Sequence, residues 1–281
     1  MSPFRASGAA VGASRTLRGA GAALAGALAL TVAGPAAGPA AGPAAAQDRP
    51  VDLELVLAVD ASGSVSDEEF SLQLRGLAEA FRDRSVNQAI RATGDLGLAV
   101  ALIQWADFHQ HALSVEWTVV RDAASGRQFA KQVEDVTRSV YGNTAIGDAL
   151  EFAILQLEGN GFVGRRKVID LSGDGPSNNG SAAPLARDMA VARGITVNGL
   201  AILNEDPTLD RYYRSNVIGG TGAFVMTAND YESYRLAILI KLIREIAGAP
   251  TARRRPSGQR QTAAATTAAT AAAAPPEHPI H

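Results

Sequence analysis

Hydrophobic and polar positions follow two alternating spacings along residues 51–247, and each spacing predicts a different element. The run LELVLAV at 53–59 is almost wholly apolar and ends at Asp60, which predicts a buried strand. Ser66, followed three residues later by Glu69, forms a capping box, and the apolar residues after it recur at helical spacing. This segment therefore predicts a strand, a loop and a helix, with the sequence DASGS in the loop.

The same alternation continues to the end of this segment. Two strand-like runs, 97–105 and 112–120, are separated by a polar stretch and predict an antiparallel hairpin at one sheet edge. Further strands are predicted at 167–171, 195–203 and 223–226, and further helices at 127–140, 144–157, 184–193 and 231–247. Strands that alternate with helices predict an α/β fold. We expect a doubly wound, mostly parallel, Rossmann-like sheet with one antiparallel edge strand and helices on both faces.

Glycine-rich residues 219–222 (GGTG) resemble a phosphate-binding loop, but they precede a predicted strand rather than a helix. A phosphate-binding loop of that kind requires a helix after it, because the phosphate lies at the helix N-terminus. A tight turn between a helix and a strand is the favoured interpretation.

The two ends of the chain differ in composition from the segment between them. Residues 1–46 contain no acidic residue and combine Arg5, Arg15 and Arg18 with an apolar run at 19–34 and a final Ala-Ala-Ala. These parts predict a signal peptide cleaved after Ala46, and hence an exported protein, periplasmic or extracellular. The alternative is a disordered Ala/Gly/Pro leader or a misassigned start. Residues 249–281, rich in Ala, Thr and Pro, are predicted to be a disordered tail.

Charge and cysteine content exclude several classes of function. The full chain has 26 basic and 28 acidic residues. The leader holds three of the bases, and the tail holds four bases and one acid, so the core has 19 bases against 27 acids. This acidic core lacks the basic face of a nucleic-acid-binding protein. The absence of cysteine excludes disulfides, thiolate metal sites and a cysteine nucleophile. No transmembrane segment is expected in the mature chain, since the apolar run at 19–34 is too short.

Two predicted strands end in acidic loops, with Asp60 after the first strand and Asp174 after the strand at 167–171. In sheets of this type, ligands bind beyond the carboxyl ends of the strands. Two carboxylates with the hydroxyls of Ser62, Ser64 and Thr144 would form an oxygen donor set for a hard cation, Mg²⁺ or alternatively Mn²⁺ or Ca²⁺. The alternative is purely local: the loop side chains satisfy nearby backbone groups, and Thr144 caps a helix.

This arrangement resembles the metal-ion-dependent adhesion site (MIDAS) of von Willebrand factor type A (vWA) domains, whose pattern is D-x-S-x-S, then a distant Thr, then a distant Asp. Asp60, Ser62 and Ser64 match the first element, Thr144 in YGNTAIGDAL the second, and Asp174 in LSGDG the third. The resemblance covers residues 51–247.

The match has two departures. The last loop reads SGDG where the family usually has Thr-Asp-Gly, and Asp170 lies inside the preceding strand, where an apolar residue is expected. Asp170 is interpreted as a buried acid bonded to a neighbouring backbone group or hydroxyl, or as a residue that tunes the site.

The resemblance implies a metal-dependent protein-binding module of the bacterial envelope, in which the cation captures an acidic residue of an unidentified partner protein without catalysis. One alternative is a metal-dependent hydrolase or phosphotransferase with Asp60 as nucleophile. Ser62 occupies the position of the second acid that such an enzyme would use, and no histidine base, nucleophile elbow or Walker loop is evident. The other alternative is a surface structural protein without a metal. His109 and His111 could form a zinc pair, but exposed hairpin residues are the favoured interpretation.

Overall fold

The computed structural model describes residues 48–248. The predicted signal peptide with its cleavage point at Ala46, and the predicted tail at 249–281, lie outside the described residues. Strands are β1 (Arg49–Val51), β2 (Leu53–Asp60), β3 (Leu98–Trp105), β4 (His111–Val120), β5 (Phe162–Gly164), β6 (Lys167–Gly173), β7 (Ile195–Ile202) and β8 (Val225–Ala228). Helices are α1 (Asp67–Arg82), α2 (Arg84–Thr93), α3 (Ala123–Glu134), α4 (Ile146–Gln156), α5 (Ala183–Ala192), α6 (Leu209–Asn216) and α7 (Tyr231–Ala247).

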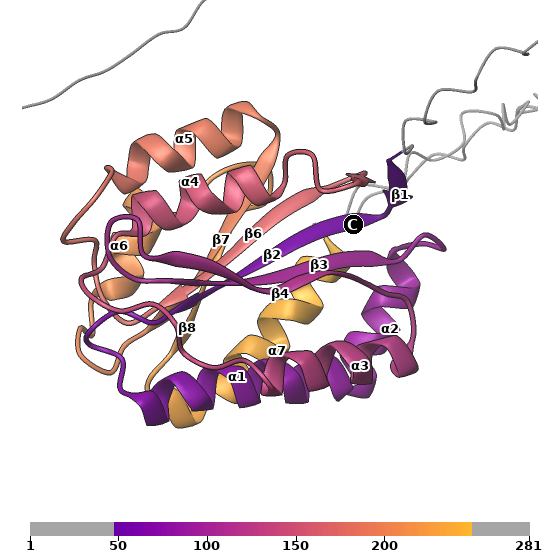
Figure 1. Ribbon diagram of the computed structural model, residues 1–281, viewed down its shortest axis with the longest axis horizontal. Helices are drawn as coiled ribbons and strands as arrows, with labels where there is room; N and C mark the ends of the chain where they lie inside the picture. Colours follow the sequence, from indigo (N-terminus) through magenta and orange to yellow (C-terminus); the bar gives the residue numbers. More distant parts are fainter. Residues whose placement is uncertain (1–47, 249–281) are drawn as a thin grey trace, which may run out of the picture. The chain divides into compact units, whose positions relative to one another are not determined.

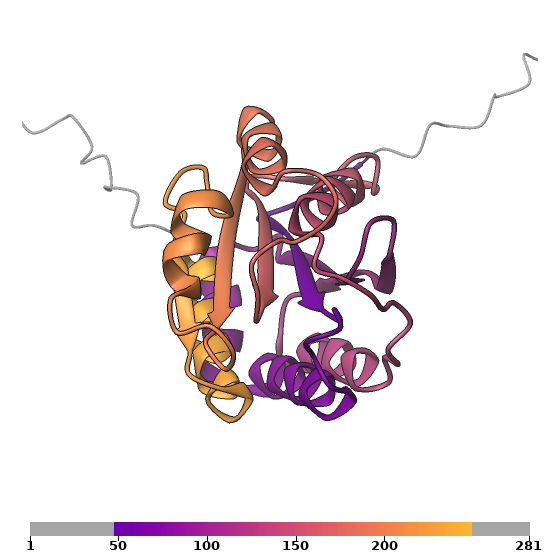
Figure 2. The ribbon, with the colours of Figure 1, turned by 90° about the vertical axis from the view of Figure 1, so that its left-hand side faces the viewer.

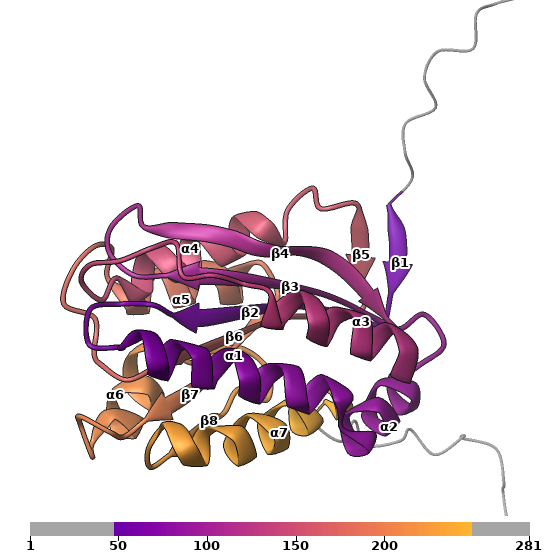
Figure 3. The ribbon, with the colours of Figure 1, turned by 60° about the horizontal axis from the view of Figure 1, so that its bottom comes forward.

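Six of the strands form one twisted sheet in the order β4-β3-β2-β6-β7-β8 (Figure 1). All neighbouring strands are parallel except β3 and β4, which form the antiparallel edge pair. Helices α4 and α5 cover one face, and α1, α2, α3 and α7 cover the other, as the end-on view in Figure 2 and the tilted view in Figure 3 show. The predicted fold class is confirmed.

The central strand β2 explains why the first apolar run shows no alternation. Leu55 and Leu57 pack into the hydrophobic cluster beneath α1, α2, α3 and α7. Val56 and Ala58 point the other way and pack beneath α4, α5 and α6. Because side chains alternate between the faces of a strand, a strand covered on both faces must be apolar at nearly every position.

The helix predicted at 127–140 lies earlier in the structure, at α3 (Ala123–Glu134). It begins there because the Asp122 carboxylate accepts hydrogen bonds from the first-turn backbone. The chain after Glu134 is irregular because buried Gln104 takes over its backbone groups. The side-chain NH₂ of Gln104 donates to the Thr137 carbonyl at 2.8 Å, and its side-chain oxygen accepts from the Ser139 N–H at 2.9 Å. A side chain on β3 thus replaces the hydrogen bonds that a longer helix would make.

Four short elements, β1, α2, β5 and α6, were not predicted from the sequence. Strands β1 and β5 pair only with each other, as a two-stranded parallel sheet. Strand β8 begins two residues later than predicted, since the Phe224 N–H bonds to the side chain of Asn198. Residues 219–222 connect α6 to β8, as expected for a turn. Within residues 48–248, no helix combines the length and apolar character needed to cross a membrane.

Asp170 is not bonded as the sequence suggested. Its carboxylate forms an ion pair with the ammonium group of Lys241 on α7, and both side chains are buried. Lys241 also contacts Glu245 Oε1 at 2.6 Å, and this oxygen accepts a bond from Asn198 Nδ2 at 2.9 Å. Burial, together with the charge of Asp170, raises the pKa of Glu245 to about 8. This polar network joins α7 to the middle of β6 and β7.

Candidate metal site

The candidate site lies where the order of the strands reverses. From β2 the chain continues to β3 on one side, whereas β6 pairs with β2 on the other side. Helices that leave neighbouring strands for opposite faces open a crevice at the carboxyl ends of those strands. Asp60 ends β2 and Asp174 directly follows β6, so both carboxylates lie at this crevice.

Four of the five predicted ligands form one connected group. The Ser62 N–H donates to Asp60 Oδ1 at 2.7 Å, and the hydroxyls of Ser62 and Ser64 lie 3.3 Å apart. The Ser64 hydroxyl donates to Asp174 Oδ1 at 2.7 Å. Asp60, Ser62 and Asp174 are buried, whereas Ser64 is exposed. The group is therefore built inside the domain and open to solvent on the Ser64 side.

Thr144, the fifth predicted ligand, lies in a loop packed directly against the DASGS loop. The Gly63 N–H donates to the Gly142 carbonyl at 2.6 Å, and a Cβ at Gly63 would lie only 3.1 Å from that oxygen. The backbone of Thr144 is held on its other side by Asn178, which bonds to its N–H and to its carbonyl, each at 2.9 Å. The helix-cap alternative for Thr144 is wrong, because α4 begins after Ala145 and has no side-chain cap.

The electrostatics of the site favour a cation. Burial and the negative charge of Asp174 raise the pKa of Asp60 to about 7, although bonds from Ser62 oppose the shift. Asp60 Oδ2 is buried and has no hydrogen-bond partner within the part of the chain that the structure describes. Two neighbouring carboxylates, one with an unpaired oxygen, are costly to bury unless a positive charge joins them.

The donor set suits a hard divalent ion. Two carboxylates with three neutral hydroxyls match the oxygen preference of Mg²⁺, Mn²⁺ and Ca²⁺. Across residues 48–248, no three His, Cys, Asp or Glu side chains gather closely enough to hold a metal, so such a site depends on the hydroxyls. The ring centroids of His109 and His111 lie 6.4 Å apart. No third His, Cys, Asp or Glu side chain within residues 48–248 joins them to form a metal site.

Three side chains that support the site were missed in the sequence. The Arg138 guanidinium donates to the carbonyls of Ala61 and Ser62 at 2.8 and 2.9 Å, and so clamps the DASGS loop. Tyr231 donates its hydroxyl to Asp174 Oδ2 at 3.0 Å. Gln73 on α1 donates to the Asp60 carbonyl at 2.9 Å. The sequence carried no signal for Tyr231 or Gln73, and Arg138 lay inside the helix predicted at 127–140.

The departure from the usual Thr-Asp-Gly loop has a steric explanation. A Cβ at Gly173 would lie 2.7 Å from Asp60 Oδ2 and 2.7 Å from the hydroxyl of Tyr213. The Tyr213 side chain is fully buried and comes from α6. A threonine at position 173 would collide with both groups, and glycine leaves the room that Tyr213 and Asp60 share.

The rim of the crevice is organised by Asp107. Its carboxylate accepts bonds from the N–H and the side-chain amide of Asn143, at 3.1 and 2.8 Å, and from the side chain of Asn179. These backbone and amide donors lower the pKa of Asp107. The Asp107 carboxylate therefore joins the β3–β4 turn to two loops, the one that carries Thr144 and the one that follows Asp174. Phe108 and Tyr141 are exposed on the same loops.

The order and direction of the strands and the helices on both faces of the sheet are those of the vWA fold, as the sequence resemblance predicted. The chain belongs to the DUF1194 family, described as "protein of unknown function", whose model matches residues 50–250. A search of curated proteins found no match.

Solved structures share the fold at low identity. Proximal thread matrix protein 1 of the mussel byssus is 18% identical with a TM-score of 0.52, over 72% of this chain and 47% of that one. It has also been solved with zinc in its MIDAS motif. The pilus adhesin SpaC of Lactobacillus rhamnosus GG is 14% identical with a TM-score of 0.50, over 72% and 31%. A von Willebrand factor type A structure from Catenulispora acidiphila is 16% identical with a TM-score of 0.49, over 70% and 43%. This chain thus spans less than half of each of these three solved chains.

Proposed function

We propose that the chain is a metal-dependent protein-binding module, which captures a carboxylate of a partner protein through a divalent cation at the crevice above β2 and β6. The observation that carries this proposal is the pair of buried carboxylates, Asp60 and Asp174. They are joined through the Ser64 hydroxyl, and Asp60 keeps one unpaired oxygen. A cation would neutralise both groups and use that oxygen.

Asp60, Ser62, Ser64, Thr144 and Asp174 would hold the ion. When bound, the cation would supply a Lewis-acid position for a carboxylate oxygen from outside. Two carboxylates balance a divalent charge and the hydroxyls add none, so the site retains its attraction for one further acidic group. The exposed side of the site at Ser64 is where a partner would approach.

The loops that Asp107 joins would provide specificity. The exposed rings of Phe108 and Tyr141 offer apolar contact beside the site, and aromatic side chains are enriched at the centres of protein interfaces. We propose Mg²⁺ as the ion, with Mn²⁺ and Ca²⁺ as alternatives, and the bacterial envelope as the location. No chemical step is assigned to Asp60, whose Oδ1 is engaged by the Ser62 N–H.

The metal can be tested by calorimetric titration of the full chain with Mg²⁺, Mn²⁺ and Ca²⁺, together with thermal unfolding, because a ligand of the native state raises its stability. Asp174→Ala should abolish both responses while the circular dichroism spectrum stays native. Asp188→Asn, which removes an exposed carboxylate on α5, is the matched control and should respond like the parent. A parent-like response in Asp174→Ala would refute the metal assignment.

The partner can be tested by retention of envelope proteins on the immobilised chain in Mg²⁺ and in EDTA. Partners of the proposed kind should be retained only in Mg²⁺ and only by a chain with Asp174 intact. Replacing acidic residues of a retained protein with their amides should identify one whose loss abolishes binding. Equal retention in EDTA would show that the domain works through another surface. Metal binding without any metal-dependent partner would support the site and contradict the adhesion role.

A further inference from the structure

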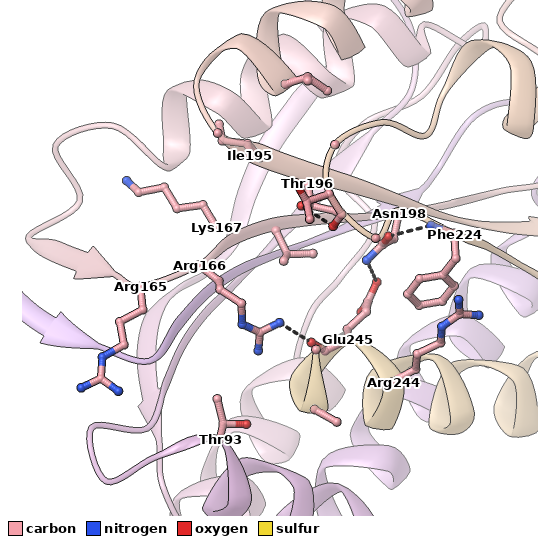
Figure 4. A pocket seen from close by; sticks show the side chains of 18 of the residues that line it. Thr93, Arg165, Arg166, Lys167, Ile195, Thr196, Asn198, Phe224, Arg244 and Glu245 are labelled. Carbon is pink, nitrogen blue, oxygen red and sulfur yellow. Dashed lines mark hydrogen bonds between the residues drawn. The ribbon is translucent and has the colours of Figure 1, made fainter. Parts of the chain in front are cut away.

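A second cavity, of about 730 Å³, lies at the end of the sheet opposite the metal site. It opens beside the first residues of β6 and β7 and the last turn of α7 (Figure 4). Its size is typical of pockets that enclose small organic ligands. The charged side chains on its wall are Arg165, Arg166, Lys167, Arg244 and Glu245. Four of these five are basic, although the domain as a whole is acidic.

Arg166 is the first of two guanidinium groups at this cavity that form no ion pair within residues 48–248. It is partly buried, and burial lowers its pKa, although the negative charges of Glu245 and Asp52 oppose the shift. It donates to the carbonyls of Glu245 and Ile246 at 2.9 and 2.6 Å, but it forms no ion pair with any residue in 48–248. Glu245 and Asp52 compensate this charge only from beyond ion-pair distance, so an anion in the cavity would supply the direct partner that buried charges in proteins normally have.

Arg244 carries the second of these two guanidinium groups. Its guanidinium carbon lies 3.8 Å from the centre of the Phe224 ring, and it too forms no ion pair among the described residues. A guanidinium stacked on a ring keeps its N–H edges in the plane and free to bind an oxyanion in two-pronged fashion. Figure 4 places Arg166 and Arg244 on either side of Glu245.

The other charges at the cavity are already compensated. Arg165 pairs with Asp52 at 3.0 Å, and Lys167 contacts Glu54 at 3.3 Å. Oε1 of Glu245 faces Lys241 in the buried network that joins α7 to the sheet. The net positive charge facing the cavity therefore comes from Arg166 and Arg244.

We propose that this cavity binds a small polyanion, a phosphate ester or a polycarboxylate, whose anionic groups pair with Arg166 and Arg244. Residues 220–222 form part of the wall. Gly220 has φ +92°, and a Cβ there would lie 3.0 Å from the Ile195 carbonyl, so the loop backbone itself closes this side. The site is separate from the metal site and does not depend on it.

The test uses the full chain with pyrophosphate and citrate as probes. Titrations are made in metal-free buffer at constant ionic strength, with chloride as the reference, so that neither chelation nor screening contributes. Saturable binding by calorimetry and a rise in melting temperature are expected for at least one probe. A response to pyrophosphate alone would indicate a phosphate ester, and a response to citrate alone a polycarboxylate.

Arg244→Met removes the charge and replaces the guanidinium above Phe224 with an unbranched apolar side chain. It should weaken binding at least about tenfold, the usual effect of losing a charge-assisted hydrogen bond. Arg75→Gln on α1 removes one exposed charge elsewhere and should bind like the parent. The proposal is overturned if neither probe binds saturably, or if Arg244→Met and Arg75→Gln bind equally well.

Discussion

Tyr231, the first residue of α7, donates its hydroxyl to Asp174 Oδ2 at 3.0 Å, and both side chains are buried. The last helix of the domain thereby fixes the orientation of a carboxylate that follows β6. Ser64 binds the other oxygen of Asp174. A carboxylate held at both oxygens is oriented before any ion arrives, and this orientation can be tested.

Tyr231→Phe should lower the affinity for the divalent ion about tenfold or more, because a hydrogen bond to a charged group contributes about 1.5–3 kcal/mol. Calorimetric titration gives the affinity. Tyr234→Phe is the matched control, since its hydroxyl is also buried on α7 but does not bond to any of the predicted metal ligands. Equal affinities for the two variants would mean that Tyr231 does not position Asp174.

Asp60→Asn should stabilise the metal-free domain at pH 8 while abolishing its response to metal. Burial and Asp174 raise the pKa of Asp60 to about 7 in the folded state, so the ionised form is unfavourable there. We expect the free energy of unfolding to rise by about 1–3 kcal/mol at pH 8. The gain should be smaller at pH 5, where folded Asp60 is protonated, and should vanish only below about pH 4, where unfolded Asp60 is protonated as well. Denaturant unfolding at both pH values measures this. If the variant is less stable than the parent at pH 8, the ionised Asp60 carboxylate does not destabilise the folded domain.

Gly173→Ala should destabilise the domain by about 1–3 kcal/mol and weaken metal binding, since its methyl group would lie 2.7 Å from Asp60 Oδ2. Gly175→Ala is the control two residues away, where a Cβ would meet no atom within 4 Å. Adding Tyr213→Phe to Gly173→Ala removes the hydroxyl that shares this space and should restore part of the stability. No restoration would mean that the two groups do not compete for one position.

Glu245 should make the domain less stable as the pH rises towards 8. Its folded-state pKa of about 8 exceeds the ordinary value of 4.5, so the folded protein binds the extra proton between these values. The stabilisation is complete below about pH 4.5 and is lost as the pH rises through 8. Glu245→Gln should remove a decline of roughly 3–4 kcal/mol between pH 5 and 8. Urea unfolding across this range would show it. Parallel curves for parent and variant would contradict the raised pKa.

The sequence alone determined the fold class and the members of the candidate site. Hydrophobic periodicity is a local property, so the buried strand at 53–59 and the α/β alternation could be predicted from it. Asp60, Ser62 and Ser64 are close in sequence, and Asp174 could be added because parallel strands end at one edge of the sheet. Thr144 follows no strand, and only the resemblance to the MIDAS pattern pointed to it.

Only the tertiary structure decided what surrounds these residues. The end of α3 depends on Gln104, which lies 30 residues earlier than Glu134 and leaves no trace in the helical pattern. Asp170 pairs with Lys241, which comes from the last helix. Tyr231 reaches Asp174 across 57 residues, and Tyr213 occupies the space beside Gly173. Such contacts join residues far apart in sequence, and a hydrophobic pattern specifies which face a residue takes but not which distant side chain it meets.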